Sequence, residues 1–447
     1  MALDRPPWSL VLALCLGYFL ILLDVTVVNV ALPQINSDLR AGASGLAWIV
    51  DGYSVPLAAL LLAAGAVGDR LGHRRIVVLG MIVFGAASVA CALAPTMGVL
   101  IAARAGQGAG AALMLPGTLA MLVERTPDAA ARTRLVGIWA AIGGAALPAG
   151  PVVGGVLVQT LGWRAVFWLA VPFIVLALVP VLRAPRGTSG SVSGRVDVAG
   201  AVLLVAALAG VVSAIITAPD DVGVAGGLAV AAVVAGTAFV VVERRARYPL
   251  ISVSRQARSV LAQACGVAAL MNLATLGGLF LLTQVFQDVH HRSPLVAGLA
   301  MLPAMAPLPL LGAPAGRLSA RIGAWRTSSL GLLVGAVGFG GMAIGIVGDD
   351  LWVLVVSLAV WGAGLGILTP AIVAAALQAV PGSPGTASGA SNTSRQTGGA
   401  LGVAIFATVA GPAGAAQFVS HSAGLFVGAG LAFALTGGWC LALHRRV

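Results

Sequence analysis

Two charged side chains stand alone inside long apolar stretches of this sequence. Asp24 lies in the run from Trp8 to Leu32, and Arg104 lies in a later run of the same kind. A carboxylate at membrane depth costs roughly 2.5 kcal/mol or more, so such residues are kept mainly for work on ions, protons or substrates. Because burial disfavours the charged form of a carboxyl group, Asp24 could load and release a proton near neutral pH. The structural alternative is an Asp24 that only fixes its helix, through hydrogen bonds to Thr26 or Asn29.

Arg104 stays protonated and therefore needs an acceptor, which Asp24 or backbone carbonyls of the first helix could supply. If the contact between Arg104 and Asp24 formed and broke as Asp24 titrates, protonation would be linked to conformation. Alternatively, Arg104 only fixes the position of its own helix. A third charge, Asp51, lies at the outer end of the second apolar run, three residues after Trp48. It either stabilises a helix N-terminus or acts as a second acid. Asp24, Arg104 and Asp51 are our candidate proton-coupling residues.

The elements that position these residues are predicted to be transmembrane helices. The chain is 59% hydrophobic and 9% charged, against roughly 25% charged residues in soluble domains. Apolar runs of bilayer length, separated by charged or Gly/Pro-rich breaks, predict fourteen helices. Their expected ranges are 8–32, 47–68, 76–94, 98–123, 135–159, 163–182, 198–217, 223–242, 259–287, 295–315, 327–347, 351–378, 387–411 and 424–443.

The distribution of arginine predicts the orientation of these helices. With a cytoplasmic N-terminus, alternate loops should be rich in basic residues. All but four of the 25 basic residues then fall in cytoplasmic ends and loops, where we also place Arg395; the opposite side holds only Arg40, Arg164 and Arg292. Both termini are therefore predicted to be cytoplasmic.

An internal sequence repeat predicts two related halves. Four residues of the loop after the second helix recur 251 positions later, after the tenth: Gly65, Arg70, Gly72 and Arg75 become Gly316, Arg321, Gly323 and Arg326. Both loops are cytoplasmic, so the repeat is parallel. We expect an all-α integral membrane fold of two pseudo-symmetric six-helix bundles, 1–183 and 258–447, with two inserted helices and their flanking cytoplasmic loops over 184–257.

Other function classes are disfavoured. The net charge of +11 suggests nucleic-acid binding, but the arginines sit in short loops and form no basic domain. The four cysteines show no metal-ligand spacing, no Gly-x-x-x-x-Gly-Lys loop exists, and no His/Asp/Glu cluster suits a membrane enzyme. A sensor would need a soluble output domain, for which the loops are too short. We expect no enzyme activity, no cofactor and no metal.

Five motifs, in order along nearly the whole chain, resemble the major facilitator superfamily and within it the fourteen-helix drug:proton antiporters. They are Leu23 to Pro33 in the first helix, the loop Gly65 to Arg75, Arg104 to Gly110 in the fourth helix, Gly143 to Gly155 in the fifth, and Asn392 to Gly399 in the thirteenth. The resemblance implies a cytoplasmic gate at Gly65, Asp69, Arg70, Gly72, Arg74 and Arg75. It also implies an antiporter motif at Pro148, Gly150, Pro151, Gly154 and Gly155.

Polar residues of the predicted spans are the candidates for substrate contact: Asn29, Tyr53, Gln107, Asn272, Thr275, Gln284 and Gln287, with Asn392 considered beside them. No buried acid is expected in the second half, which argues against dicationic substrates. We therefore predict a monomeric antiporter of the bacterial inner membrane that exports hydrophobic neutral or monocationic small molecules. Its expected partners are this substrate, protons and the lipid bilayer. The alternative is a narrow exporter of a metabolite or of a self-made antibiotic.

Overall fold

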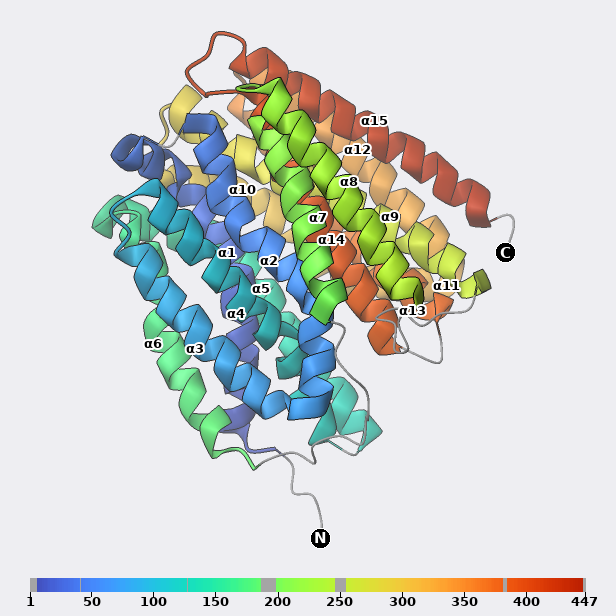
Figure 1. The fold of residues 1–447 in the computed structure, drawn as a ribbon. Helices are drawn as coiled ribbons and strands as arrows, with labels where there is room; N and C mark the ends of the chain where they lie inside the picture. The colour runs from blue at the N-terminus through green and yellow to red at the C-terminus, as the bar shows by residue number, and fades with distance from the viewer. Residues whose placement is uncertain are drawn as a thin grey trace. The chain divides into compact units, whose positions relative to one another are not determined.

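The computed structural model describes residues 6–40, 42–126, 128–185, 198–245, 255–380 and 384–444 of the chain (Figure 1). Over these residues the regular structure is entirely helical. Bilayer-length apolar segments must satisfy every backbone polar group internally, and a helix does so within one segment. Pro33, Pro56 and Pro116 are accommodated inside long helices, as is common where neighbouring helices support the bend.

The first eight helices run from the N-terminus to the middle of the chain. They are α1 (Trp8–Leu39), α2 (Gly42–Leu71), α3 (His73–Ala92), α4 (Met97–Glu124), α5 (Ala129–Leu161), α6 (Arg164–Arg183), α7 (Val198–Thr217) and α8 (Val222–Arg245). The remaining helices are α9 (Arg255–Gln284) with the π-helical turn η1 (Val285–Val289), α10 (Pro294–Met305), α11 (Pro307–Ile322), α12 (Ala324–Val347), α13 (Leu351–Ala379), α14 (Pro384–Ala410) and α15 (Phe418–His444).

Thirteen helical segments in the described part of the chain are long and apolar enough to cross a membrane. One of them, Pro294–Ile322, combines α10 and α11, which are separated at Ala306. Pro307 lacks the N–H that would continue the helix at this point. The helix α14 has 27 residues but is not among the thirteen, because its first half is rich in Ser, Thr, Gly and Asn. The all-helical membrane fold is confirmed, whereas the predicted count of fourteen spans is not.

The chain divides into two compact units. Unit 1 comprises Met1–Ala41, Trp48–Ala214 and Gly223–Leu250, and unit 2 comprises Gly42–Ala47, Ile215–Val222 and Ile251–Val447. Figure 1 shows α3 beside α6 within unit 1, and α12 beside α15 within unit 2. The predicted division at 1–183, 184–257 and 258–447 stays a prediction.

The two loops whose sequences repeat, between α2 and α3 and between α11 and α12, also have the same backbone geometry. Gly72, between α2 and α3, has φ 89°, and Gly323, between α11 and α12, has φ 92°. The amide of Gly72 donates to the carbonyl of Gly68 at 2.9 Å, and the amide of Gly323 donates to the carbonyl of Ser319 at 3.0 Å. L side chains rarely adopt such a positive φ, so both turns favour glycine.

Helix contacts inside the two units repeat as well. In unit 1, Gly108 of α4 lies against the carbonyl oxygen of Tyr53 in α2, and in unit 2, Gly362 of α13 lies against that of Ala304 in α10. A Cβ atom at either glycine would overlap the oxygen. Such close backbone approach is typical of small residues between membrane helices.

The helix α14 occupies in unit 2 the place that α5 occupies in unit 1. Gly154 of α5 packs against the carbonyl of Val27 in α1, and Gly402 of α14 packs against the carbonyl of Leu273 in α9. One turn earlier, each of the two helices has a further glycine in close contact with the same partner helix. Gly398 and Gly402 of α14 therefore correspond to Gly150 and Gly154 of α5.

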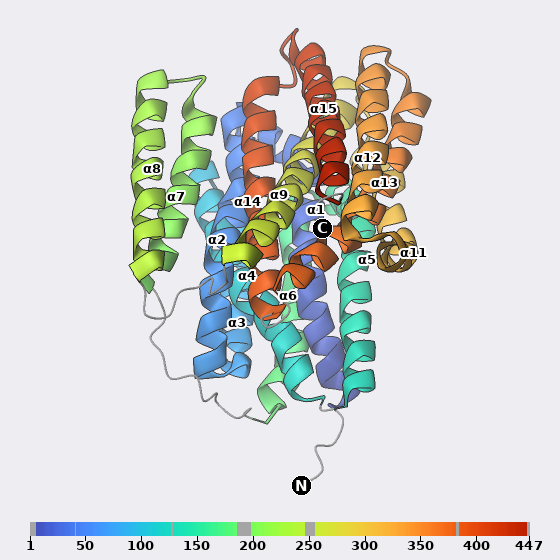
Figure 2. The same ribbon diagram turned by 90° about the vertical axis from the view of Figure 1, so that its right-hand side faces the viewer.

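The helices α7 and α8 lie side by side in both views (Figures 1 and 2). A Cβ atom at Gly210 of α7 would lie 2.9 Å from the Cβ of Ala232 in α8. Val222, Val230 and Val233 are each more than half exposed. Exposed valine of this kind suits contact with lipid.

Candidate functional site

The two charges that stood out in the sequence meet inside unit 1. Nη1 of Arg104 in α4 lies 2.5 Å from Oδ2 of Asp24 in α1, and only 7% of Asp24 and 1% of Arg104 is exposed. Asp24 is placed by an apolar helix that buries the residues on both sides of it, Leu23 and Val27 among them. A charge pair shielded from water in this way is strong only while both partners remain ionised.

Arg104 has further partners that hold its guanidinium plane. Its Nε donates to the carbonyl of Ile49 in α2 at 2.9 Å, and Nη1 also donates to Oε1 of Gln107 at 2.9 Å. The guanidinium carbon lies 4.5 Å from the ring centroid of Tyr53, within the range of a cation–π interaction. Arg104 therefore connects α1, α2 and α4 through one side chain.

Gln107 extends the network to α3. Its Nε2 donates to Ser88 Oγ at 2.8 Å and lies 3.4 Å from Oδ1 of Asp24, while its Oε1 accepts from the thiol of Cys91 at 3.3 Å. The hydroxyl of Tyr53 donates to the carbonyl of Ile21 at 3.1 Å. Tyr53 and Gln107, expected as substrate contacts, are thus members of the charge network. Sequence reasoning missed Ser88 and Cys91, since neither residue type is unusual inside an apolar helix.

Asp51 is not where sequence reasoning placed it. We expected the outer end of the second helix, but α2 already begins at Gly42 and has no acidic residue in its first turn. Asp51 is fully buried, and among the described residues neither of its carboxylate oxygens has a hydrogen-bond partner. Stabilisation of a helix N-terminus therefore does not explain it. The structure keeps Asp51 outside the hydrogen-bond network of Arg104.

The remaining polar candidates are distributed over both units. Asn29 of α1 donates to the carbonyl of Val25 at 2.8 Å, while its buried Oδ1 has no hydrogen-bond partner in the described part of the chain. In α9, Thr275 donates to the carbonyl of Met271 at 2.7 Å. Farther along the chain, Gln284 is buried and Gln287 lies in η1. Asn272 and Asn392 are half-buried in α9 and α14.

The expected gate loop is tied to its own bundle. His73 Nε2 lies 3.3 Å from Glu124 Oε1 at the end of α4. Arg74 donates from Nε to the carbonyl of Val181 at 3.1 Å and from Nη2 to that of Leu182, both in the last turn of α6. A cation at a helix C-terminus is stabilised by the helix dipole. Arg70 and Gly65 are half-buried, Arg75 is exposed, and the side chain of Asp69 lies outside the described residues.

The expected antiporter motif packs on the helix of Asp24. A Cβ atom at Gly150 of α5 would overlap the side chain of Thr26, and one at Gly154 would lie 3.0 Å from the carbonyl of Val27. Pro148 and Pro151 lie inside α5, and Gly155 is buried. The motif therefore brings α5 into backbone contact with α1 within one turn of Asp24.

Sequence reasoning missed an ion pair where the end of α1 meets the start of α6. The indole Nε1 of Trp163 donates to Oδ2 of Asp38 at 2.9 Å, and Nη1 of Arg164 lies 3.7 Å from the same oxygen. The Arg164 guanidinium also lies 4.3 Å from the Trp163 ring centroid. Only the positions of these residues beside predicted helix ends could have suggested the cluster, which joins α1 to the start of α6.

Arg395, which we assigned to the cytoplasmic ends and loops, lies within the predicted range 387–411 and within α14, where it is half-buried. Its side of the membrane stays a prediction.

The sequence model of the Major Facilitator Superfamily matches residues 14–403. The chain belongs to the major facilitator superfamily. This membership makes it a multi-pass membrane protein of a family of transporters, which are not enzymes.

Its relatives include antibiotic resistance proteins. The methylenomycin A resistance protein of Streptomyces coelicolor is 36% identical, with coverage of 97% of this chain and 92% of the relative. The tetracenomycin C resistance and export protein of Streptomyces glaucescens is 34% identical, with coverage of 89% and 75%. The expected resemblance to the superfamily and to its drug-resistance and efflux proteins is confirmed.

Solved structures show the same fold at low identity. A peptide transporter crystallised in complex with sulfate matches with a TM-score of 0.75 at 17% identity, covering 98% of this chain and 94% of the other. The xylose transporter of E. coli, in a partially occluded inward-open conformation, matches with a TM-score of 0.67 at 14% identity, covering 96% of each chain. These matches concern the fold alone.

Proposed function

We propose that this chain is a proton-coupled antiporter that exports hydrophobic neutral or monocationic small molecules by alternating access. The observation that carries the proposal is the buried pair of Asp24 and Arg104, joined by a short hydrogen bond between α1 and α4. Intramembrane ionisable residues of transporters commonly serve in proton relays. The names of the resistance and export proteins among the relatives support the direction of transport.

Protonation of Asp24 would remove the charge that holds Arg104. The guanidinium would keep the carbonyl of Ile49 and the amide oxygen of Gln107 as acceptors, and α1 would lose its charged link to α4. Because Gly150 and Gly154 bring α5 into close contact with α1, a movement of α1 would be transmitted to α5. A proton would in this way bias the conformations between which the transporter alternates.

Efflux of ethidium from energised cells tests this proposal. Wild type should export ethidium and lose export when a protonophore is added, whereas Asp24→Asn should be expressed in the membrane and inert. Asp220→Asn is the matched control, because Asp220 is exposed in the turn between α7 and α8. If Asp24→Asn still pumps uphill and responds to pH, another acid such as Asp51 carries the proton.

A narrow exporter of one metabolite or antibiotic is the second candidate. It is favoured by relatives named for resistance to single compounds, methylenomycin A and tetracenomycin C. A panel of unrelated antibiotics separates the two: broad resistance supports the first candidate, and resistance to one compound supports the second.

We further propose an inner-membrane location with both termini cytoplasmic, and a monomeric transporter. The distribution of arginine supports this orientation. Reporter fusions at Arg5 and at the C-terminus should both report a cytoplasmic location, and a periplasmic signal from either one would refute the orientation.

A further inference from the structure

A groove on the surface of unit 2 takes no part in the proposed proton coupling. It has a volume of about 480 Å³ and lies between α9 and α15, and its lining includes Ser259, Gln263, Leu270, Thr436 and Trp439. Small-molecule sites commonly have volumes of about 300–1,000 Å³. Both helices belong to unit 2, so the groove lies within one unit.

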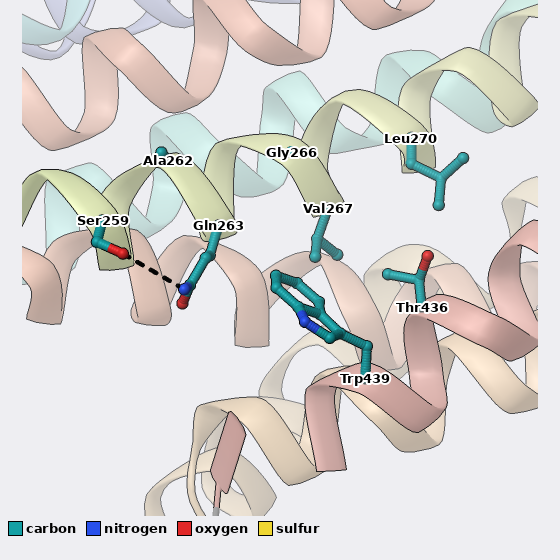
Figure 3. Close-up of a pocket in the computed structure, with 8 residues that line it drawn as sticks. All are labelled: Ser259, Ala262, Gln263, Gly266, Val267, Leu270, Thr436 and Trp439. Atoms are coloured by element: carbon teal, nitrogen blue, oxygen red, sulfur yellow. Dashed lines mark hydrogen bonds between the residues drawn. The ribbon is translucent and has the colours of Figure 1, made fainter. Parts of the chain in front are cut away.

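Polarity changes along the groove. Ser259 and Gln263, near the start of α9, supply a hydroxyl and an amide, and Nε2 of Gln263 donates to Oγ of Ser259 at 3.5 Å. Farther along α9 the lining residues are the apolar Val267 and Leu270. A rise of 1.5 Å per residue puts Leu270 about 16 Å from Ser259 along the helix axis. Figure 3 shows Ser259 and Gln263 on one side of the Trp439 ring and Leu270 on the other. The groove therefore suits a molecule with a polar head and an apolar tail.

The α15 side of the groove belongs to an apolar, exposed surface. Trp439 is 43% exposed, and Leu431 and Leu435, at intervals of four residues before it, are each more than half exposed. Residues four apart share one face of a helix. Exposed leucine suits contact with lipid, and tryptophan is enriched where hydrocarbon meets the polar headgroups. The groove therefore lies beside a lipid-facing surface.

Two arginines lie next to the polar part of the groove. Arg258 is exposed and directly precedes Ser259 in α9. Arg326 is exposed in α12 and directly follows Trp325, whose ring centroid lies 6.4 Å from that of Trp439. A guanidinium presents a planar fork of donors that matches a phosphate.

The acids of this part of the chain lie far from the groove. Residues 251–447 contain only three, Asp288, Asp349 and Asp350. Asp288 follows the far end of α9, and the other two follow α12, at whose start Trp325 lies. Each is more than about 30 Å along its helix from the groove residues. Within residues 251–447 the groove end is therefore electropositive, which favours an anionic ligand over the neutral or cationic substrates proposed above.

We propose that this groove binds an anionic phospholipid of the bilayer. The phosphate lies by Arg258, Arg326 and Ser259, and one acyl chain follows Val267 and Leu270 away from the start of α9. The proposed orientation puts this end of unit 2 at the cytoplasmic leaflet, where anionic lipids attract basic residues.

Native mass spectrometry of the purified protein tests this proposal. The protein in detergent micelles is titrated with phosphatidylglycerol or with phosphatidylcholine of the same acyl chains. Wild type should bind phosphatidylglycerol at least about tenfold more tightly, as expected for charge-assisted hydrogen bonds. Arg258→Gln/Arg326→Gln should lose this preference. Arg317→Gln/Arg321→Gln is the matched control, because both arginines are exposed in α11, which contributes no lining residue.

A steric variant tests the groove itself. Gly266 lines the groove, and a Cβ atom there would meet nothing within 4 Å. Gly266→Leu should therefore fold, occupy the groove and weaken binding of phosphatidylglycerol several-fold. Gly428→Leu in α15 also points into open space and lies outside the groove, so it should bind as wild type does.

Three results would overturn the site: equal affinity of wild type for the two lipids, the same loss in both double arginine variants, or unchanged binding of phosphatidylglycerol by Gly266→Leu. If Gly266→Leu weakens binding of ethidium and leaves binding of phosphatidylglycerol unchanged, the groove takes a transported molecule and the lipid site is refuted. If Gly266→Leu cannot be purified, the comparison of the two double arginine variants decides.

Discussion

Removing one partner of the buried pair gives the sharpest test of the network in unit 1. Arg104→Gln leaves the Asp24 carboxylate without its nearest cation and removes the donors to Ile49 and Gln107. Breaking a buried pair from one side costs about 3–5 kcal/mol, because the remaining charge stays desolvated. Asp24→Asn should also destabilise the protein, since it leaves a buried guanidinium without a counter-charge.

The double variant Asp24→Asn/Arg104→Gln should lose less free energy of unfolding than the two single variants lose together. Both remaining groups are neutral and can hydrogen-bond to each other. The two residues share one network, so we expect a coupling free energy of about 2–3 kcal/mol, at the upper end for contacting residues.

Reversible unfolding in mixed detergent micelles at pH 7, followed by tryptophan fluorescence, measures the free energy of unfolding. The wild type, the two single variants and the double variant are compared. The pair Asp38 and Asp24 provides a control cycle, because both lie in α1 but Asp38 accepts from Trp163 whereas Asp24 accepts from Arg104. A coupling below about 0.5 kcal/mol between Asp24 and Arg104 would mean that the two sites behave as independent, and the ion pair would then be refuted.

Two glycine substitutions, each with a matched control, probe the repeated backbone geometry and helix packing. Gly72→Ala forces a side chain into φ 89° and should lower the free energy of unfolding by about 1–3 kcal/mol; the same change at Gly137, where a Cβ meets nothing within 4 Å, should be neutral or stabilising. Gly402→Leu should destabilise by at least about 1–3 kcal/mol, because its side chain would overlap the carbonyl of Leu273. Gly428→Leu, which meets open space, should be tolerated. Thermal unfolding measures each variant, and equal losses at test and control sites would contradict the packing described.

Much of the fold could be predicted because it depends on local chemistry. A bilayer-length apolar run such as Trp8 to Leu32 can hardly be anything but a helix, since lipid offers no partners to its backbone. The repeat was visible because Gly72 and Gly323 serve the same positive-φ turn. The meeting of Asp24 and Arg104 was also foreseen as one option, because a deep guanidinium needs an acceptor.

The misplacement of Asp51 has a physical cause. Sequence reasoning began the second helix at residue 47, but Gly42 to Leu46 extend it at its N-terminal end, so Asp51 lies in the interior of the helix and not at its end. Helix boundaries in Gly- and Ser-rich segments carry a weak apolar signal, so tertiary packing decides them.

By itself, the sequence determined that this protein is a helical membrane transporter with an acid and an arginine at depth, because hydrophobic length and isolated charge are properties of single segments. Only the tertiary structure decided that Gln107, Ser88 and Tyr53 complete the network around Arg104. These relations join residues on different helices, and their distances depend on how the helices pack rather than on any one segment.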